Sequence, residues 1–239
     1  YFRNFILLPE PETESLRFGS VVHTAIERIF KKKITSKKDI SVLVSSVLDE
    51  LLVWNERVRA RFTKDAVKLL ERFVSDFLPK FSNARSEKKI SSFRDPDVPH
   101  IEITGKIDLI QNLPDAASSV TDFKTGKVKT SGEIEKRTTE GRMSGLLRQL
   151  AMYSYLLMHM KGEQPVSLSR LFFVEAEEGD RDMVYETTIG SEEIALLRKD
   201  IKDYDLLLAS GEWIDVPCNF KPFGHQKECE YCALAKNLK

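Results

Sequence analysis

Residues 101–127 form the stretch that most constrains how this chain can fold. Apolar residues alternate with polar ones over 101–109, and a second short apolar run follows over 120–124. Both patterns are typical of β-strands, and the Asn-Leu-Pro-Asp segment that separates them favours a turn. The sequence therefore predicts a β-hairpin here.

Charged side chains lie on this hairpin where a core strand should be apolar. Asp122 and Lys124 are two residues apart, so they share one face of their strand, while Phe123 points to the other face. Asp108 lies in the middle of the first strand. Because an unpaired buried charge is costly, two acids beside an ammonium make sense if they share a divalent cation, with the lysine near its water or substrate. The alternative is a partly exposed hairpin with weak surface ion pairs.

Composition limits the function classes. The chain has 239 residues, of which 41% are hydrophobic and 31% charged, as expected for a globular domain with one core and a helical insertion. No apolar run approaches the length of a membrane span, so a membrane partner is not expected. Lys plus Arg equals Asp plus Glu at 37 each, which does not favour unaided capture of nucleic acid. Another domain would then deliver the strand, or basic residues would gather locally near 31–33, 37–38 and 127–129.

Helical patterns precede the hairpin. Residues 16–33 show apolar residues at helical spacing after Ser15, an expected N-cap, and this helix places His23 and Glu27 on one face. Residues 39–82 are helical throughout and are interpreted as a helical insertion, with Trp54 and Phe62 in its core. The opening on Tyr1, without an initiator Met, suggests a fragment of a longer protein.

Helices and strands also follow the hairpin. The polar, apolar-poor stretch 130–142 is expected to be a mobile loop beside the charged cluster, able to close over a bound strand. Residues 146–160 predict a helix on which Gln149 and Tyr153 share a face. The remaining patterns predict strands at 167–175 and 183–189 and a helix at 191–209 capped by Ser191.

Cysteines are confined to the C-terminal tail, about 211–239, where Cys218, Cys229 and Cys232 accompany His225. The Cys-x-x-Cys spacing allows two thiolates to bind one metal ion. Zinc, an iron–sulfur cluster and reduced cysteines without metal all remain open. Three cysteines argue against a secreted disulfide framework and favour a reducing, cytoplasmic setting.

Four short motifs occur in a recognisable order: Gly19-x-x-x-His23, Gly105-x-x-Asp108, Asp122-x-Lys124 and Gln149-x-x-x-Tyr153. Together they resemble the motif series of the PD-(D/E)XK nuclease superfamily. The branch is similar to the RecB-type or AddB-type domain at the C-terminus of helicase–nuclease subunits. The resemblance covers residues 1–239 and implies one α/β domain with a restriction-endonuclease-like core, a small mixed central sheet flanked by helices, and a helical insertion at about 39–82.

The resemblance also assigns roles to residues. It implies that His23, Asp108 and Asp122 are ligands of Mg²⁺ or Mn²⁺, and that Lys124 is the catalytic lysine. Gln149 and Tyr153 would assist near the substrate strand, and Glu27 would add an outer contact. Iron–sulfur members of this branch use one cysteine before the aromatic start and three at the C-terminus. This chain has no cysteine after Cys232, and Cys218 is the expected substitute.

The expected function is therefore a divalent-metal-dependent deoxyribonuclease that hydrolyses phosphodiester bonds. Acting as an exonuclease, it would degrade single-stranded DNA delivered by a helicase domain or subunit in DNA repair and recombination. The alternative is a non-catalytic nucleic-acid-binding module, or an interaction module of a helicase complex stabilised by metal at the cysteine tail.

Overall fold

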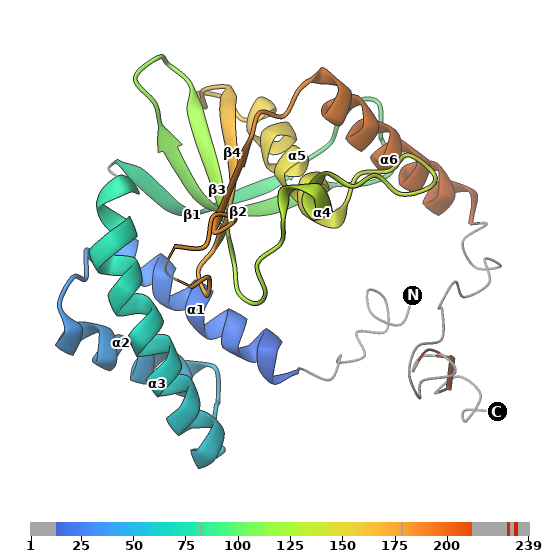
Figure 1. Ribbon diagram of the computed structural model, residues 1–239. Helices are drawn as coiled ribbons and strands as arrows, with labels where there is room; N and C mark the ends of the chain where they lie inside the picture. The colour runs from blue at the N-terminus through green and yellow to red at the C-terminus, as the bar shows by residue number, and fades with distance from the viewer. Residues whose placement is uncertain (1–12, 82, 178, 212–228, 230–231, 234–239) are drawn as a thin grey trace.

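A computed structural model describes residues 13–81, 83–177, 179–211, 229 and 232–233 of the chain. Five strands within these residues form one sheet in the order β1-β2-β3-β4-β5. β3 and β4 run parallel, whereas the other neighbours are antiparallel, so the sheet is mixed (Figure 1). The strands are β1 (Ala84–Phe93), β2 (Ile103–Asn112), β3 (Ser118–Lys124), β4 (Val166–Phe173) and β5 (Val184–Thr187).

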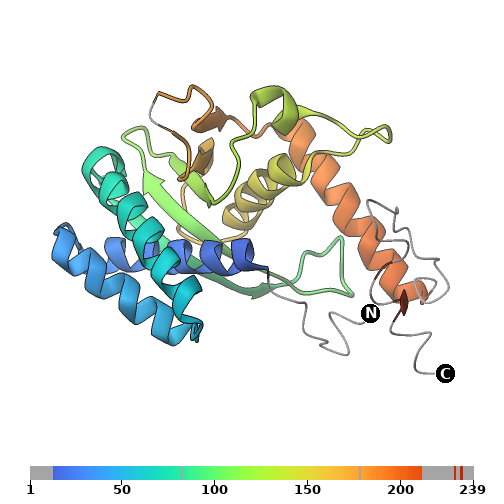
Figure 2. The ribbon, with the colours of Figure 1, turned by 60° about the horizontal axis from the view of Figure 1, so that its bottom comes forward.

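Helices cover both faces of this sheet. Figure 2 shows α1, α2 and α3 as a layer on one side of the strands, with α5 and α6 on the other. The helices are α1 (Glu14–Lys32), α2 (Lys37–Glu50), α3 (Glu56–Arg72), α4 (Ser131–Glu135), α5 (Gly145–Met158) and α6 (Ser191–Ser210). α3 continues through a π-helical turn, Phe73–Phe77, and a 3-10 turn, Leu78–Phe81. The expected fold class, a small mixed sheet flanked by helices, is confirmed.

The alternation along β3 divides the core between the two faces. Phe123 packs toward α1–α3, where its ring centroid lies 5.6 Å from that of Phe73 in an edge-to-face contact. Val120 packs with residues of α5 instead. The short β3 is buried along almost its whole length, so any polar side chain on it is removed from water and must find a partner inside the protein.

The central hairpin is confirmed. β2 and β3 pair with Leu109 opposite Thr121, and the connecting turn closes with the Leu113 N–H donating to the Ala117 carbonyl at 2.8 Å. β3 then crosses through α4 and α5 to the parallel strand β4. This crossover brings α5 across the face of the sheet that carries the hairpin's polar side chains.

Several local expectations need correction. Residues 130–142 do not form one polar loop, because Thr130 and Glu133 make a capping box that starts α4, and the Ile134 side chain is fully buried. Trp54 is 69% exposed, unlike Phe62, which is buried as expected. The helix N-caps are Thr13, two residues before the expected Ser15, and Gly190, one residue before the expected Ser191.

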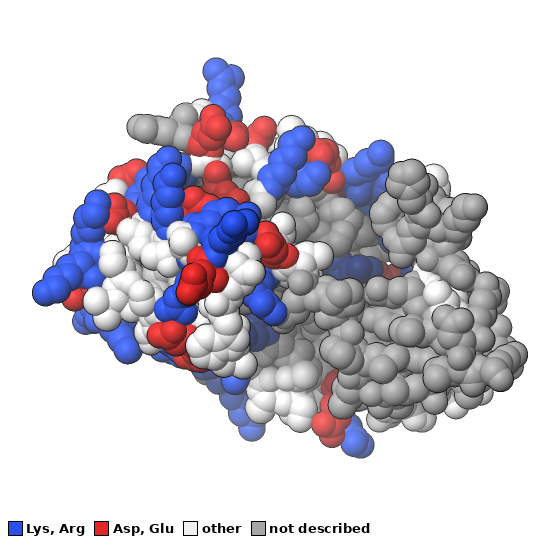
Figure 3. Space-filling view, turned by 90° about the horizontal axis from the view of Figure 1, so that it is seen from below, with Lys and Arg blue, Asp and Glu red and all other residues white. Residues whose placement is uncertain are grey.

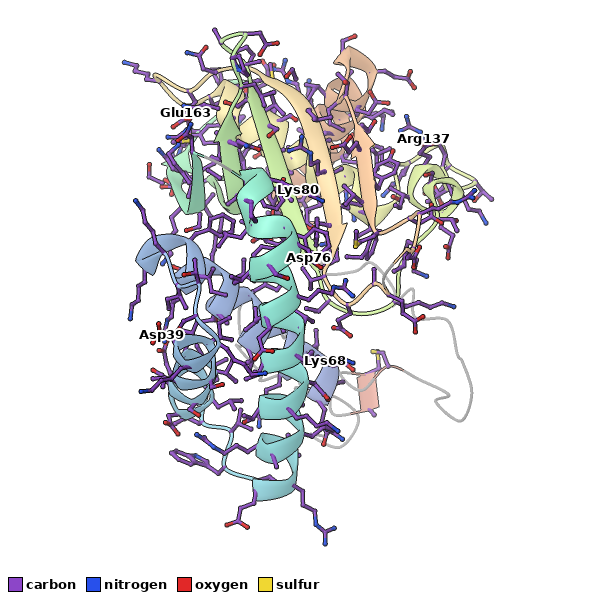
Figure 4. All side chains as sticks on the ribbon, turned by 60° about the vertical axis from the view of Figure 1, so that its left-hand side comes forward. Asp39, Lys68, Asp76, Lys80, Arg137 and Glu163 are labelled. Carbon is purple, nitrogen blue, oxygen red and sulfur yellow. The ribbon has the colours of Figure 1, made fainter. Side chains whose placement is uncertain are left out.

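Ion pairs from two partly exposed cations to the buried Glu163 side chain join the α5–β4 connection to β1. The Glu163 side chain, labelled in Figure 4, is only 6% exposed and accepts hydrogen bonds from Arg85 at 2.7 Å and Lys88 at 3.0 Å. The hydrogen bond from Arg85 is the main cause that lowers the pKa of Glu163 to about 2. Since this pKa is lowered in the folded state, the pair stabilises the protein above the ordinary carboxyl pKa, and the contribution is lost as pH falls toward 2.

Replacing Glu163 with Gln should therefore lower the free energy of unfolding at pH 7 by about 1–3 kcal/mol. It should also flatten the decline in stability between pH 5 and pH 2. Urea unfolding across this pH range measures both effects. Glu102→Gln is the matched control, because Glu102 pairs with Arg94 at the surface, where an ion pair contributes little. An equal loss of unfolding free energy in Glu163→Gln and Glu102→Gln would contradict the stabilising role given to the Glu163 ion pairs.

Candidate active site

The site begins where β2 and β3 separate. The recorded pairing of these strands runs to Leu109 and Thr121, so Asp108 and Asp122 are the next opposing residues. Asp108 Oδ2 accepts a hydrogen bond from the Phe123 N–H at 3.0 Å. A carboxylate thus takes the place of a backbone acceptor and fixes the end of β3 against β2. This contact holds the two carboxyl groups on neighbouring strands.

Asp122 is the most buried charged group of the site, with an exposed fraction of 1%. Its Oδ1 accepts hydrogen bonds from Gln149 Nε2 at 2.7 Å and from the Tyr153 hydroxyl at 2.9 Å. Its Oδ2 is also buried, yet it accepts no hydrogen bond from the residues that the structure describes. Lys124 Nζ lies 2.8 Å from Oδ2, close enough for an ion pair but outside hydrogen-bond geometry.

Burial dominates the electrostatics of this carboxyl group. Desolvation raises the pKa of Asp122, the charge of Lys124 opposes that rise, and the nearby Asp108 adds to it. Burial also raises the pKa of Tyr153, as does the negative charge of Asp122. Tyr153 therefore stays a neutral phenol that donates its proton to Asp122. A cation beside Oδ2 would favour the ionised carboxylate and relieve its desolvation.

Lys124 lies between two of these groups. Its ammonium donates to Gln149 Oε1 at 2.5 Å and pairs with Asp122. Gln149 thus bridges the acid and the lysine, with its amide nitrogen on one and its oxygen on the other. An ammonium has three protons, so a further donor remains for a third group. The Lys124 side chain is 23% exposed, which leaves that donor accessible from outside the core.

Gln149 and Tyr153 lie together as the sequence predicted, one helical turn apart on α5, with Gln149 Nε2 3.3 Å from the Tyr153 hydroxyl. Tyr153 is buried beneath Asp122 rather than placed at the surface. In this structure both side chains hold the acid and the lysine in position, and Tyr153 does not reach outward to a substrate strand.

His23 approaches the site from α1. Its Nδ1 lies 3.4 Å from Asp108 Oδ2, so it contacts the first carboxylate. Glu27, one turn further along α1, forms an ion pair with Lys31. His23 therefore lies beside Asp108, whereas the contact recorded for Glu27 is its ion pair with Lys31.

The expected metal ligands are only partly assembled. Among the described residues, no group of three His, Cys, Asp or Glu side chains lies close enough to hold a metal ion. The two carboxylates nevertheless fit a hard divalent cation, because they are oxygen donors on neighbouring strands and Asp122 Oδ2, which has the Lys124 ammonium 2.8 Å away, accepts no hydrogen bond. Mg²⁺ commonly uses one or two carboxylates and completes its coordination with water and substrate phosphate. Asp108 and Asp122 are the residues that would hold such a cation.

One contact at the end of β3 had no signal in the sequence. The Gly126 N–H, two residues after Lys124, donates to Glu175 Oε1 at 2.9 Å. Glu175 follows β4, which pairs in parallel with β3. Because strand pairing across the crossover brings these residues together, only the topology could reveal the contact. It anchors the segment that follows β3.

Gly19, the first residue of the Gly19-x-x-x-His23 motif, lies where α1 closely approaches the segment that follows β3. A Cβ atom at this position would lie 2.7 Å from Thr125 Oγ1, directly after Lys124. A side chain on α1 would therefore push against the end of the strand that carries the lysine.

Gly19→Ala should lower the free energy of unfolding by about 1–3 kcal/mol through this clash. The gain in helix propensity, about 1 kcal/mol, acts in the opposite direction. Removing the hydroxyl in Gly19→Ala/Thr125→Ala should restore most of the loss. A double-mutant cycle by denaturant unfolding measures the coupling. Strict additivity of the two substitutions would show that the contact is absent.

The expected second metal site lies partly outside the described residues. Cys218 and His225 are not described, whereas Cys229 and Cys232 are, and the Cys232 N–H donates to Cys229 Sγ at 3.3 Å. The expected zinc or iron–sulfur centre therefore stays a prediction.

In the part of the chain that the structure describes, no helix is long and apolar enough to cross a membrane.

Comparison with solved structures bears on the fold. A crystal structure from Eubacterium rectale, of a protein provisionally assigned as an exonuclease, aligns with a TM-score of 0.53 at 12% identity, covering 91% of this chain and 79% of that one. This likeness supports the restriction-endonuclease-like fold. The structure of SSO0001 aligns with a TM-score of only 0.31 at 17% identity, covering 85% of this chain and 80% of that one, and carries no argument.

Sequence comparison gives the family. No curated protein sequence matches the chain. The model of the PD-(D/E)XK nuclease superfamily, however, matches residues 1–236, which includes every motif residue of the site. The chain therefore belongs to the PD-(D/E)XK nuclease superfamily.

Proposed function

We propose that this chain is a divalent-metal-dependent deoxyribonuclease that degrades single-stranded DNA from an end. One observation carries the proposal: a buried Asp122 is paired with Lys124, and Gln149 holds both, while one carboxylate oxygen is left without a hydrogen bond. That oxygen, Oδ2, has the Lys124 ammonium 2.8 Å away but accepts no hydrogen bond, which leaves it able to accept a further ligand. Membership of a nuclease superfamily supports hydrolysis as the reaction.

The residues divide the work of phosphodiester hydrolysis. Asp108 and Asp122 would hold Mg²⁺ or Mn²⁺, which polarises the phosphate and lowers the pKa of bound water when present. Lys124 is placed to donate a hydrogen bond to the attacking water or to the phosphate oxygen on which charge develops. Gln149 and Tyr153 keep the lysine and the acid in register, so that little reorganisation is needed during the reaction.

The proposed setting is a helicase-linked nuclease of the RecB type that acts in DNA repair and recombination in the cytoplasm. The neutral net charge of the chain supports this, because the domain has no general basic excess with which to capture DNA from solution. A motor domain or subunit would supply the strand. A zinc or iron–sulfur centre on Cys218, Cys229 and Cys232 belongs to the same proposal, and metal analysis of the purified protein tests it.

Cleavage assays with four DNA substrates test the proposed activity. The protein is incubated with 5′-labelled linear single strands, 3′-labelled linear single strands, duplexes of the same sequence, and circular single strands, each with Mg²⁺, Mn²⁺ or EDTA. We expect cleavage of the linear single strands that needs the cation, with little cleavage of circles. Efficient cleavage of circles would overturn the exonuclease assignment, and no cleavage of any substrate with either cation would favour the non-catalytic binding module.

A further inference from the structure

A row of cations runs along one face of α3. Its members follow one another at intervals of three or four residues, which places them on a single helix face. With a rise of 1.5 Å per residue the row is about 22 Å long. Two acids, Asp65 and Glu71, flank the row on α3, and Glu71 pairs with Lys37 at 3.2 Å. This cationic row consists of Arg57, Arg61, Lys64, Lys68 and Arg72.

Most of these charges are available to a ligand. Arg57, Lys64 and Lys68 are exposed, and none forms an ion pair with another described residue. Arg61 pairs with Glu14 at the surface, and Arg72 lies over the Phe77 ring at 5.7 Å. Figure 4 shows Lys68 on the side of α3 away from α2, where Asp39 is labelled. Figure 3 shows Lys and Arg side chains standing out from the described part of this face, with Asp and Glu side chains between them.

A groove beside the row ends at the residues that directly follow Lys124. It encloses about 590 Å³ between α1, α3 and the segments that follow β3 and β4. Thr125 and Gly126 line its inner end, immediately after Lys124. The walls include the rings of Phe18 and Phe62, which contact each other edge to face with centroids 5.2 Å apart.

The lining of this groove holds four acids and three cations. Two of the acids are engaged, since Glu14 pairs with Arg61 and Glu175 accepts the Gly126 N–H. Asp65 and Glu177 are the remaining acids of the lining. The positive charge beside the groove therefore comes from the cationic row of α3 and not from the lining as a whole.

An aromatic side chain stands at the outer end of the row. Trp54 is 69% exposed and precedes Asn55, the N-cap of α3, by one residue. A tryptophan so exposed at the tip of a helical hairpin contributes little to the core. Exposed rings interspersed with cations are the features with which proteins bind unpaired bases and phosphates together.

We propose that the cationic row of α3, the groove beside it and Trp54 bind single-stranded nucleic acid and guide it to the site at Lys124. The inference rests on the proposed nuclease function and adds the path of the substrate. The row supplies phosphate contacts along its length, and Trp54 supplies a stacking surface that a duplex with paired bases cannot use. The binding is independent of sequence, because phosphates and ring faces are common to all nucleotides.

Equilibrium binding in EDTA separates this path from catalysis. The full chain is titrated onto fluorescein-labelled oligothymidylate, and fluorescence anisotropy is followed at several salt concentrations. The test variant is R57Q/K64Q/K68Q, and the control is K89Q/K161Q/K202Q, which removes the same charge at exposed positions elsewhere. We expect the test variant to bind at least tenfold more weakly than the control. Its plot of log affinity against log salt should be shallower by about 2, since each phosphate contact on a single strand contributes about 0.7.

Trp54→Ala should weaken binding between about fivefold and 150-fold, and Trp54→Phe should keep most of the affinity, because stacking needs only a ring. Equal affinity and salt dependence of the two triple variants would overturn the proposal. So would an equal loss of affinity for a duplex of the same length. Because the assay needs no cleavage, a wild-type protein that binds but never cuts would refute the nuclease function and leave the path intact.

Discussion

Replacing Lys124 with Met is expected to reduce the rate of DNA cleavage by about 100- to 1,000-fold, the loss typical of a donor that stabilises developing charge. Methionine keeps the unbranched shape of the lysine and removes its ammonium. The pair with Asp122 and the hydrogen bond to Gln149 disappear together. Single-turnover cleavage of a labelled single strand measures the chemical step without product release.

Lys127→Met is the matched control for this prediction. Lys127 is exposed, lies three residues further along the chain and forms no ion pair with any residue the structure describes. Its replacement should change the single-turnover rate less than about threefold. If Lys124→Met cuts as fast as Lys127→Met, Lys124 is not the catalytic lysine.

Replacing Asp122 with Asn should separate activity from stability. We expect cleavage to fall by about 1,000-fold, because the variant loses a charged ligand of the cation. We also expect Tm to rise by about 2–4 °C at pH 8, which corresponds to about 1 kcal/mol for a chain of this size. The amide oxygen of Asn can still accept the hydrogen bonds from Gln149 and Tyr153, while the desolvated charge is gone.

The pH dependence of this stability difference has a definite sign. Burial raises the pKa of Asp122 in the folded state, so the stability associated with this group is full below the ordinary carboxyl pKa and is lost as pH rises through the raised value. The advantage of the Asn variant should therefore be largest above that value and shrink in acid. Asp115→Asn, in the exposed hairpin turn, should show neither effect. A drop in Tm for Asp122→Asn at pH 8 would contradict this electrostatic account.

The central part of the site could be predicted because its geometry is local. The period of two along β3 places Asp122 and Lys124 on one face, and the helical period places Gln149 beside Tyr153. The hairpin then brings Asp108 next to Asp122 because its turn fixes the register. Short-range periodicity was enough for each of these relations.

Other features depend on tertiary packing, which the sequence pattern does not contain. The burial of Tyr153 beneath Asp122 depends on how α5 crosses the sheet, and the contact of Glu175 with Gly126 depends on the parallel pairing of β4 with β3. The exposure of Trp54 depends on how α2 and α3 meet. Because large aromatic side chains are usually buried, the sequence pattern favoured a core position for Trp54, which is in fact exposed.

The distribution of charge on the surface also depends on the folded structure. Runs of adjacent lysines at 31–33, 37–38 and 127–129 were the conspicuous basic features of the sequence. The cationic row of α3 is interrupted by apolar and acidic residues and becomes a continuous surface only when the helix forms. A net charge of zero therefore coexists with a local row of cations.

The most direct test of the account is the cation dependence of single-turnover cleavage by the wild-type chain and by Asp108→Asn. Excess protein is mixed with labelled single-stranded DNA while Mn²⁺ is raised from zero, and EDTA is added at the end. The account predicts a rate that saturates with Mn²⁺, stops with EDTA and falls by at least about 100-fold in the variant. Cleavage that persists in EDTA, or that is equally fast in Asp108→Asn, would contradict the claim that these carboxylates form a metal-dependent nuclease site.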